Sequence, residues 1–446
     1  MTEPLNSGDI STRLRRIATL AREHPERAFR SIHHVIDASF LKEAYRRTRK
    51  DGAVGVDGRT AAAYAEHLES NLSALLTRLK TGSYRAPPVR RVHIPKGDGG
   101  QRRPIGIPTF EDKILQRAVS MVLEALYEQD FLDCSYGFRP GRSAHHALGA
   151  LRDALMHMRH SWVLELDIQG FFDSLDHQCL RSFLDHRVTD GVLRRVTHKW
   201  LKAGVMEGGQ VTRSATGSPQ GGVISPLLAN IYLHYVLDLW FEREVKPRLR
   251  GKAVLVRYAD DVVVVFEHEH DARRVLAVLG KRLEKYGLQM HPDKTRLVQF
   301  GPPDNRGSGE GGGGSGSFDM LGLTHHWARS RKGNWVVKQR TARRRFSRSV
   351  RQVYLWCRNN RHLPVVVQRT ALAAKLRGHY SYFGITGNSD ALVRFYRAVT
   401  RAWQKWLGRR SHKAKRDWQW FNRLLDRLPL PRPAAVHSTY RLLAKP

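Results

Sequence analysis

Hydrophobic residues follow two different periods along the chain. Within residues 111–128 and 272–286, apolar positions recur every three or four residues, which predicts amphipathic helices. Shorter runs rich in β-branched residues, such as 162–168 and 253–258, predict strands. Because such helices and strands alternate up to about residue 300, we expect an α+β fold there, followed by a mainly helical end.

Two adjacent carboxylates interrupt one of the predicted strands. The stretch LVRYADDVVVVF places Asp260 and Asp261 between two apolar runs, which predicts a hairpin with the aspartates at its tip. Taken alone, such a pair is more typical of an ordinary exposed turn. However, two like charges side by side repel each other unless a cation neutralises them, so the pair is also a candidate site for a divalent ion with oxygen ligands.

A third acidic ligand is expected elsewhere if the pair binds metal. Asp167 is the candidate, because it comes at the end of the apolar strand 162–168 and just before Gly170. Glu165 and Asp173 are the alternatives: Glu165 lies deeper on the same strand face, and Asp173 lies at a predicted helix start, where capping is the ordinary role. Three aspartates that hold two Mg²⁺ ions about 4 Å apart are typical of in-line phosphoryl transfer, here nucleotide polymerisation.

The charge of the chain indicates a polyanionic partner. The 446 residues include 76 Lys and Arg against 41 Asp and Glu, giving a formal net charge of +35 and a pI near 10.8. No run approaches the ~18 apolar residues of a membrane-spanning helix, and the first residues lack the profile of a secretion signal. We therefore expect a cytoplasmic protein without a membrane partner.

Most of the net positive charge, +26 of +35, lies in residues 320–446, because acidic residues are rare there. Residues 320–446 contain 29 Lys and Arg but three Asp and Glu, and no acidic residue occurs between Met320 and Ser389. Aromatic residues interleave with this charge, as in proteins that stack single-stranded nucleic acid, although a solvated basic face over an aromatic core would give a similar pattern. A basic helix face is predicted at Arg343, Arg344, Arg345, Arg348 and Arg351, and candidate stacking aromatics are Tyr354, Trp356, Tyr380, Tyr382 and Phe383.

A Gly/Ser-rich stretch, residues 301–317, is predicted to be a linker, because its irregular glycine spacing and its prolines do not fit a phosphate-binding loop. The predicted domains are 1–325 and 326–446. Cys134, Cys179 and Cys357 are far apart, so neither a disulfide framework nor a zinc site is expected. The run EHEH at 267–270 is read as a strand-to-helix connection and not as a metal site.

Several motifs in a fixed order give the chain a specific resemblance. They include GVDG, IPKGDGGQRRPIGIPTFEDKILQ, SYGFRPGRSAHHAL, LELDIQGFFDSLDH, GSPQGGVISPLLANIYL, RYADD, HPDKT and FDMLGL. Together they resemble group II intron-encoded reverse transcriptases with a maturase domain, of the bacterial type. The resemblance implies a right-hand polymerase, with fingers, an antiparallel palm sheet and an N-terminal extension in 1–325 and a helical thumb and RNA-binding maturase domain in 326–446.

The resemblance also implies roles for individual residues. Asp167, Asp260, Asp261 and the backbone of Ile168 would hold two Mg²⁺ ions. Phe172 would exclude the ribose 2′ hydroxyl, and KLRGHYSYFG would place Lys375 and Arg377 against RNA. The incoming dNTP would be bound by Lys96, Arg102, Phe172 and Gln220.

The implied biology is splicing assistance and retrohoming of a host intron. The implied partners are group II intron RNA, an RNA template with a DNA primer, target DNA and dNTPs, whereas the oligomeric state is open. Ser218 and Gln169 differ from the commonest residues of the family, and no His/Cys cluster follows for an endonuclease domain, so we expect none. Two alternatives are a freestanding reverse transcriptase used in phage defence or DNA repair, and an RNA-binding splicing factor with a dispensable polymerase.

Overall fold

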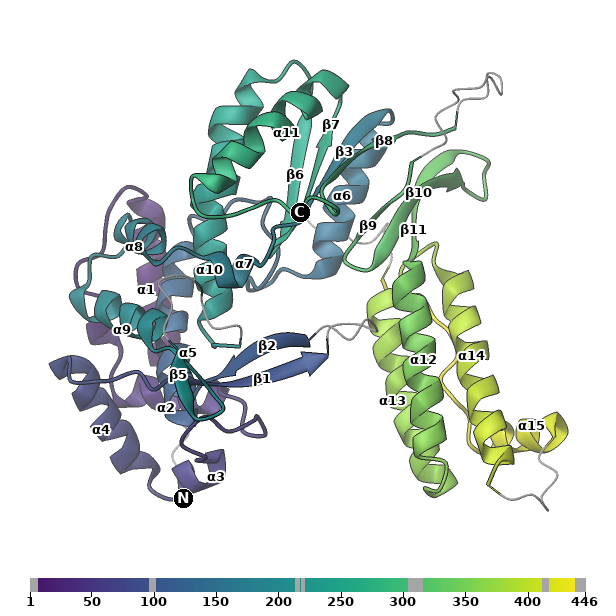
Figure 1. Cartoon of the computed structure of the whole chain (residues 1–446), viewed down its shortest axis with the longest axis horizontal. Helices are drawn as coiled ribbons and strands as arrows, with labels where there is room; N and C mark the ends of the chain where they lie inside the picture. Colours follow the sequence, from purple (N-terminus) through teal and green to yellow (C-terminus); the bar gives the residue numbers. More distant parts are fainter. Residues whose placement is uncertain are drawn as a thin grey trace. The chain divides into compact units, whose positions relative to one another are not determined.

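The computed structural model describes residues 7–95, 102–212, 217, 221–303, 316–410 and 417–437. It contains two compact units (Figure 1). The first unit comprises 1–143, 166–262 and 270–296, and the second comprises 144–165, 263–269 and 297–446. The predicted boundary near residue 325 does not coincide with these units and stays a prediction, and most of the predicted linker, 304–315, lies outside the described residues.

Helix α5 (Phe110–Tyr127) is the central helix of the first unit. Thr109 caps it, since the Thr109 hydroxyl accepts a hydrogen bond from the Asp112 amide at 3.2 Å, and most of its side chains are buried. α1 (Ser7–Glu23) and α2 (Ala38–Arg47) pack against it, which confirms the helix predicted over 111–128. The other helices of this unit are α3 (Ala61–Ala65), α4 (Leu68–Thr81), α7 (Phe171–Ser174), α8 (His177–Asp185), α9 (Gly191–Lys202) and α11 (Glu269–Glu284), with 3₁₀ turns at His33–Val35 and Lys246–Arg248.

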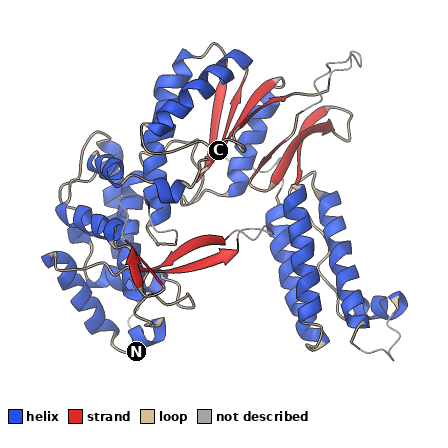
Figure 2. Ribbon diagram, viewed as in Figure 1, coloured by secondary structure: helices blue, strands red, loops and turns tan. Residues whose placement is uncertain are grey.

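Two short hairpins form a four-stranded sheet in the first unit. β1 (Val89–Pro95) pairs antiparallel with β2 (Arg102–Ile107), in the register that places Pro95 opposite Arg102. β4 (Val205–Glu207) pairs antiparallel with β5 (Gln210–Thr212) and parallel with β1. The order is therefore β2-β1-β4-β5, and Figure 2 shows these strands in red.

A second four-stranded sheet has the order β6-β7-β3-β8. Its strands are β6 (Ala253–Tyr258), β7 (Asp261–Phe266), β3 (Ser161–Leu166) and β8 (Arg296–Phe300). Every residue of β7 after Asp261 is buried. The strands predicted at 162–168 and 253–258 are confirmed, as is the hairpin that joins β6 to β7 through Ala259 and Asp260.

The helix after residue 225 changes its winding. α10 (Ser225–Leu233) is α-helical, but the next residues form π-helical stretches, η2 (His234–Asp238) and η3 (Phe241–Val245). A π-helix has i to i+5 hydrogen bonds, so each turn holds more residues than an α-helical turn. Residues after Leu233 therefore point in other directions than a continuous α-helix would give them.

The second unit combines a small sheet with a helical bundle. β9 (Phe318–Met320), β10 (Leu323–Arg329) and β11 (Trp335–Thr341) form an antiparallel sheet of order β11-β10-β9, and α6 (Ala144–His157) packs on β11. Figure 1 shows the bundle of α12, α13 and α14 with α15 at its end. These helices are α12 (Arg343–Asn359), α13 (Val365–Phe383), α14 (Ser389–Gly408) and α15 (Trp418–Arg427).

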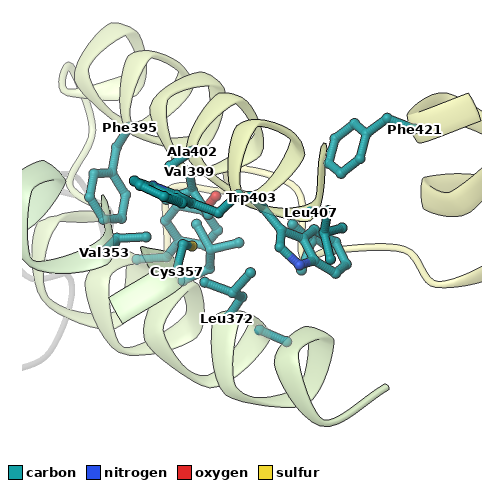
Figure 3. Close-up of a cluster of buried hydrophobic side chains, with 14 of the residues drawn as sticks. Val353, Cys357, Leu372, Phe395, Val399, Ala402, Trp403, Leu407 and Phe421 are labelled. Carbon is teal, nitrogen blue, oxygen red and sulfur yellow. The ribbon is translucent and has the colours of Figure 1, made fainter. Parts of the chain in front are cut away.

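The bundle is held together by one apolar cluster, which we call the bundle core (Figure 3). Trp403 is fully buried in it, lies edge-on to Phe421 with ring centroids 5.5 Å apart, and donates its indole N–H to Gln368 at 3.0 Å. The α+β fold class and the helical end are thus confirmed. The buried members of the cluster are Val353, Cys357, Leu372, Ala373, Leu376, Tyr380, Leu392, Phe395, Val399, Ala402, Trp403, Trp406, Leu407, Phe421 and Leu430.

None of the helices in the described part of the chain combines the length and the apolar character that crossing a bilayer requires.

Candidate active site

The β6–β7 turn presents the two adjacent aspartates. Ala259 adopts a left-handed conformation (φ 56°), which reverses the chain within a tight turn. Asp260 follows it and is partly buried, whereas Asp261 begins β7 and is exposed. The valine-rich sequence on both sides is buried, so packing fixes the register in which the carboxylates leave the sheet.

Asp167 lies directly after β3, the strand next to β7 in the sheet. Its carbonyl accepts a hydrogen bond from the His291 amide at 2.8 Å, and the Gln169 amide donates to the Gln289 carbonyl at 2.8 Å. These bonds, with the antiparallel bridge of Ile168 to Met290, fasten the HPDKT segment beside Asp167. The carboxylate of Asp167 is 36% exposed and accepts from Lys294 Nζ at 2.9 Å.

The charges of Asp167 and Asp260 act on each other. Burial raises the pKa of Asp260 above its usual value, and the neighbouring negative charge of Asp167 raises it further, whereas Arg103 and Arg257 lower it. Two carboxylates that repel each other in a partly buried place favour a cation, and the Lys294 ammonium is the cation that contacts Asp167 here. This donor set of carboxylate oxygens fits a divalent metal ion.

The described residues do not form a complete metal cage. Within them, no group of three or more His, Cys, Asp and Glu side chains is arranged to hold a metal ion. Asp167 and Asp260 interact, but the joint position of all three aspartates as ligands stays a prediction. Of the two alternatives, Asp173 is exposed in α7 and Glu165 is partly buried in β3.

The predicted nucleotide-binding residues are only partly described. Arg102 is the exposed first residue of β2, and Phe172 is half-buried in α7, edge-on to buried Phe171 with ring centroids 5.3 Å apart. Lys96 and Gln220 lie outside the described residues. Sequence reasoning missed Arg103, which neighbours the predicted Arg102 and acts electrostatically on Asp260.

The predicted basic face begins helix α12. Arg343, Arg344 and Arg345 occupy its first turn and are exposed, and that turn has no acidic residue. Positive charges are unfavourable at the N-terminal end of a helix dipole, so their placement is not explained by helix stability. Arg348 is partly exposed in the same helix, and Lys375 and Arg377 are exposed on α13.

The aromatic residues among these cations are not arranged as the stacking prediction expected. Tyr380 is buried in the bundle core, so the prediction that it stacks on nucleic acid was wrong. Tyr354, Trp356 and Phe383 pack against that core and are only partly buried, while Tyr382 is half-buried. These rings cover the edge of the bundle core and bury its apolar side chains. The Lys375 ammonium lies 5.5 Å from the centre of the Trp356 ring, within the range of a cation–π contact.

Comparison with known proteins gives one family match and several relatives. Residues 94–325 match the family model described as Reverse transcriptase (RNA-dependent DNA polymerase). The chain is similar to the Group II intron-encoded protein LtrA of Lactococcus lactis subsp. cremoris, with 43% identity over 187 residues that cover 41% of this chain and 31% of LtrA. The matched part therefore spans about a third of LtrA.

Two other relatives extend the picture. Protein YkfC of Escherichia coli K12 is 36% identical over 325 residues, which cover 65% of this chain and 84% of YkfC. Nuclear intron maturase 3, mitochondrial, of Arabidopsis thaliana is 26% identical over 225 residues, which cover 44% of this chain and 31% of the plant protein. The matched family segment contains Asp167, Asp260 and Asp261.

Proposed function

Because the chain belongs to the reverse transcriptase (RNA-dependent DNA polymerase) family, with group II intron-encoded proteins among its relatives, we propose that it copies RNA into DNA. The observation that carries the proposal is the electrostatic interaction of Asp167 with Asp260, at the ends of neighbouring strands inside the matched segment. Such a pair is suited to hold the metal ions on which nucleotide transfer depends.

In the proposed mechanism, Asp167, Asp260 and Asp261, with the backbone of Ile168, hold two Mg²⁺ ions. Held there, divalent ions would supply positive charge that favours deprotonation of the primer 3′ hydroxyl and offsets the charge of the leaving pyrophosphate. Asp167, which accepts from Lys294 Nζ in this structure, would become a metal ligand, and the β6–β7 turn would keep Asp260 at a fixed position. The number and the kind of the ions belong to the proposal.

The nucleotide is proposed to be held by residues on the fingers side. Arg102, together with Lys96 and Gln220, would bind the dNTP, since guanidinium and ammonium groups are suited to a triphosphate. Phe172 would exclude a 2′ hydroxyl by occupying its place. In this right-hand architecture, the helical bundle serves as thumb and maturase domain.

Group II intron RNA is the proposed partner of the basic face. The exposed cations Arg343, Arg344, Arg345, Arg348, Lys375 and Arg377 would contact phosphates. Splicing of a host intron, its copying into a DNA target during retrohoming and a cytoplasmic location complete the proposal. The relatives whose names refer to group II introns and intron maturases support this biology.

Primer extension tests the catalytic part. We expect the protein to extend a DNA primer on an RNA template in Mg²⁺, and Asp260→Ala to lose more than about 10³-fold of that rate while RNA binding persists. Extension by Asp260→Ala at the unmutated rate would show that the metal assignment is wrong. RNA binding without extension by the unmutated protein would favour the splicing factor with a silent polymerase.

Crosslinking to RNA in the native cells tests the biological part. A dominant structured RNA whose gene surrounds this reading frame is expected for an intron maturase. Recovery of a scattered set of RNAs, or of one separate small RNA, would contradict the intron assignment and favour a freestanding reverse transcriptase.

A further inference from the structure

Arg257 lies three residues before Asp260, at a position where β6 is fully buried. A guanidinium group has five N–H donors and cannot be neutralised easily, so its burial demands five acceptors. The first unit provides all five. Nε donates to Asp238 Oδ1 at 2.7 Å and one terminal nitrogen to Asp238 Oδ2 at 2.5 Å, which makes a bidentate ion pair in which both side chains are 0% exposed.

The other three donors reach three different segments. The nitrogen that contacts Asp238 Oδ2 also donates to the Ser135 hydroxyl at 2.8 Å. The remaining nitrogen donates to Asn230 Oδ1 at 2.9 Å and to the carbonyl of Ala259 at 3.1 Å. The last of these bonds ties the guanidinium to the turn that carries Asp260.

The π-helical stretch explains how two of these acceptors meet one guanidinium. Eight residues of α-helix rotate by two turns and about 80° more, so Asn230 and Asp238 would point in different directions on a regular helix. η2 (His234–Asp238) rotates less per residue, which brings Asp238 back toward the face of Asn230. The π-helical winding therefore allows Asn230 and Asp238 to accept hydrogen bonds from the same guanidinium group.

The segment from Cys134 to Gly137 also contacts β6 and the turn that follows it. The Arg257 amide donates to the Cys134 carbonyl and the Tyr136 amide to the Arg257 carbonyl, both at 2.8 Å, while Asn230 Nδ2 donates to the Gly137 carbonyl at 2.7 Å. A Cβ atom on Gly137 would lie 2.4 Å from the Ala259 nitrogen, so only glycine allows this approach. Ala259 thus accepts a hydrogen bond from the Arg257 side chain, and the backbone of Gly137 packs directly against it.

We propose that Arg257 is a positioning residue, which fixes the Ala259 turn so that the Asp260 carboxylate binds the divalent ion with high affinity. The inference rests on the proposed function, because it concerns the same metal site. Arg257 acts through the turn and through Asp238, Asn230 and Ser135, and it touches neither substrate nor metal. Partners that orient metal ligands typically change affinity by about 10- to 100-fold when they are removed.

Direct metal binding tests this role without relying on polymerisation. Mn²⁺ is titrated into the full-length chain without nucleic acid, free Mn²⁺ is measured by electron paramagnetic resonance, and Asp260→Ala defines the binding that belongs to the site. We expect Arg257→Lys, which keeps the charge but loses the five-bond pattern, to weaken that binding about 10- to 100-fold. Ser135→Ala, which removes one acceptor, should weaken it about two- to tenfold.

Arg187→Lys is the matched control. Arg187 is also buried, pairs with Asp130 at 2.8 Å and donates to several backbone carbonyls of residues 21–27, but it does not contact the turn. It should lower the melting temperature as Arg257→Lys does and leave Mn²⁺ affinity unchanged.

Four outcomes would overturn the positioning role, and a fifth separates it from the polymerase proposal. Unchanged Mn²⁺ affinity in Arg257→Lys, or an equal loss in Arg187→Lys, overturns the positioning role, as does the absence of any Asp260-dependent binding. If Arg257→Lys does not fold, an unchanged affinity in Ser135→Ala overturns it. If the unmutated protein binds Mn²⁺ through Asp260 but extends no primer, the polymerase proposal fails, whereas the positioning role stands as long as Arg257→Lys alone weakens that binding.

Discussion

The surroundings of the Asp260 turn and the bundle of α12, α13 and α14 bury different kinds of side chain. Beside the turn, the interior contains the Arg257–Asp238 ion pair, with Asn230 and Ser135 as further acceptors. The bundle core contains aliphatic and aromatic side chains around Trp403, and the cations of its helices lie at its surface.

The difference fits the two tasks proposed for these regions, metal binding at the turn and RNA binding on the bundle. A metal ion requires its oxygen ligands at fixed positions, and directional bonds to a buried guanidinium restrict a turn more narrowly than apolar contacts do. Phosphate groups of RNA are attracted by displayed charges over several ångströms, so the cations need exposure more than fixed geometry. We therefore expect replacement of the buried polar residues beside the turn to disturb its geometry. Removal of surface charges from the bundle should leave the fold of the bundle intact.

Removal of the fully buried tryptophan from the bundle core should have the largest effect on stability. Trp403→Ala leaves a cavity and removes the indole donor to Gln368 Oε1. We therefore expect the free energy of unfolding to fall by about 3–5 kcal/mol, measured by chemical unfolding followed by circular dichroism. Trp418→Ala, at a ring that is 47% exposed, is the control and should cost less than about 1 kcal/mol. Similar losses in both variants would contradict an apolar origin of the bundle's stability.

Removal of the charges that begin α12 should leave the fold intact and weaken RNA binding. Changing Arg343, Arg344 and Arg345 together to Gln should lower RNA affinity about 10- to 100-fold and reduce the salt dependence of log K by about two. Binding isotherms at several salt concentrations measure both effects, and the melting temperature should not fall, since these charges oppose the helix dipole. Arg274→Gln with Lys281→Gln, on α11, is the control; an equal loss there would indicate non-specific attraction.

Substitution of Phe172, near the candidate active site, should change the choice of nucleotide sugar. Phe172→Ala should remove the ring proposed to exclude a 2′ hydroxyl, so we expect ribonucleotide use relative to deoxynucleotide use to rise about tenfold, measured as the ratio of kcat/KM values. Deoxynucleotide incorporation itself should change little. If discrimination stays as before, the gate lies at another residue.

The buried carboxylate of Glu43 in the first unit should make the free energy of unfolding depend on pH. The hydrogen bond from Arg46 lowers the pKa of Glu43 most, burial opposes it and Arg47 adds to the lowering, so that together they bring the pKa from 4.5 to about 2. The folded pKa is below the unfolded one, so this stabilisation is present above about pH 4.5 and is lost as the pH falls toward 2. Glu43→Gln should cost about 1–2 kcal/mol at pH 7 and progressively less in unfolding series at lower pH; a pH-independent cost would rule out the ion pair as the cause.

Local sequence patterns predicted the elements that carry the site. The helix expected over 111–128 is α5 (Phe110–Tyr127), and the β6–β7 turn was predicted because apolar runs on both sides left only Ala259 and two aspartates between them. Asp167 was predicted from its place at the end of a strand. These features depend on a few consecutive residues, for which periodicity is informative.

The residues that support the site could not be predicted in this way, because their partners are distant in sequence. Lys294 contacts Asp167 across 127 positions, and Arg257 gathers acceptors from segments between 135 and 259. Nor does apolar spacing distinguish a ring that closes a core from a ring that stacks on a base, and Tyr380 was misread for this reason. The π-helical winding after Leu233 also leaves no sign in a pattern that reads as one helix.

That winding makes the length of the chain between Asn230 and Asp238 a functional quantity. Eight residues of regular α-helix would turn Asp238 about 80° away from the face of Asn230, whereas a one-residue deletion would leave seven residues and return Asp238 to within about 20° of that face. Such a deletion would therefore give the helix regular backbone hydrogen bonds and still direct Asp238 toward Arg257. A one-residue insertion in regular helix would instead turn Asp238 by about another 100°, so an insertion in this interval is a more severe change than a deletion, although every residue that would bind metal is retained.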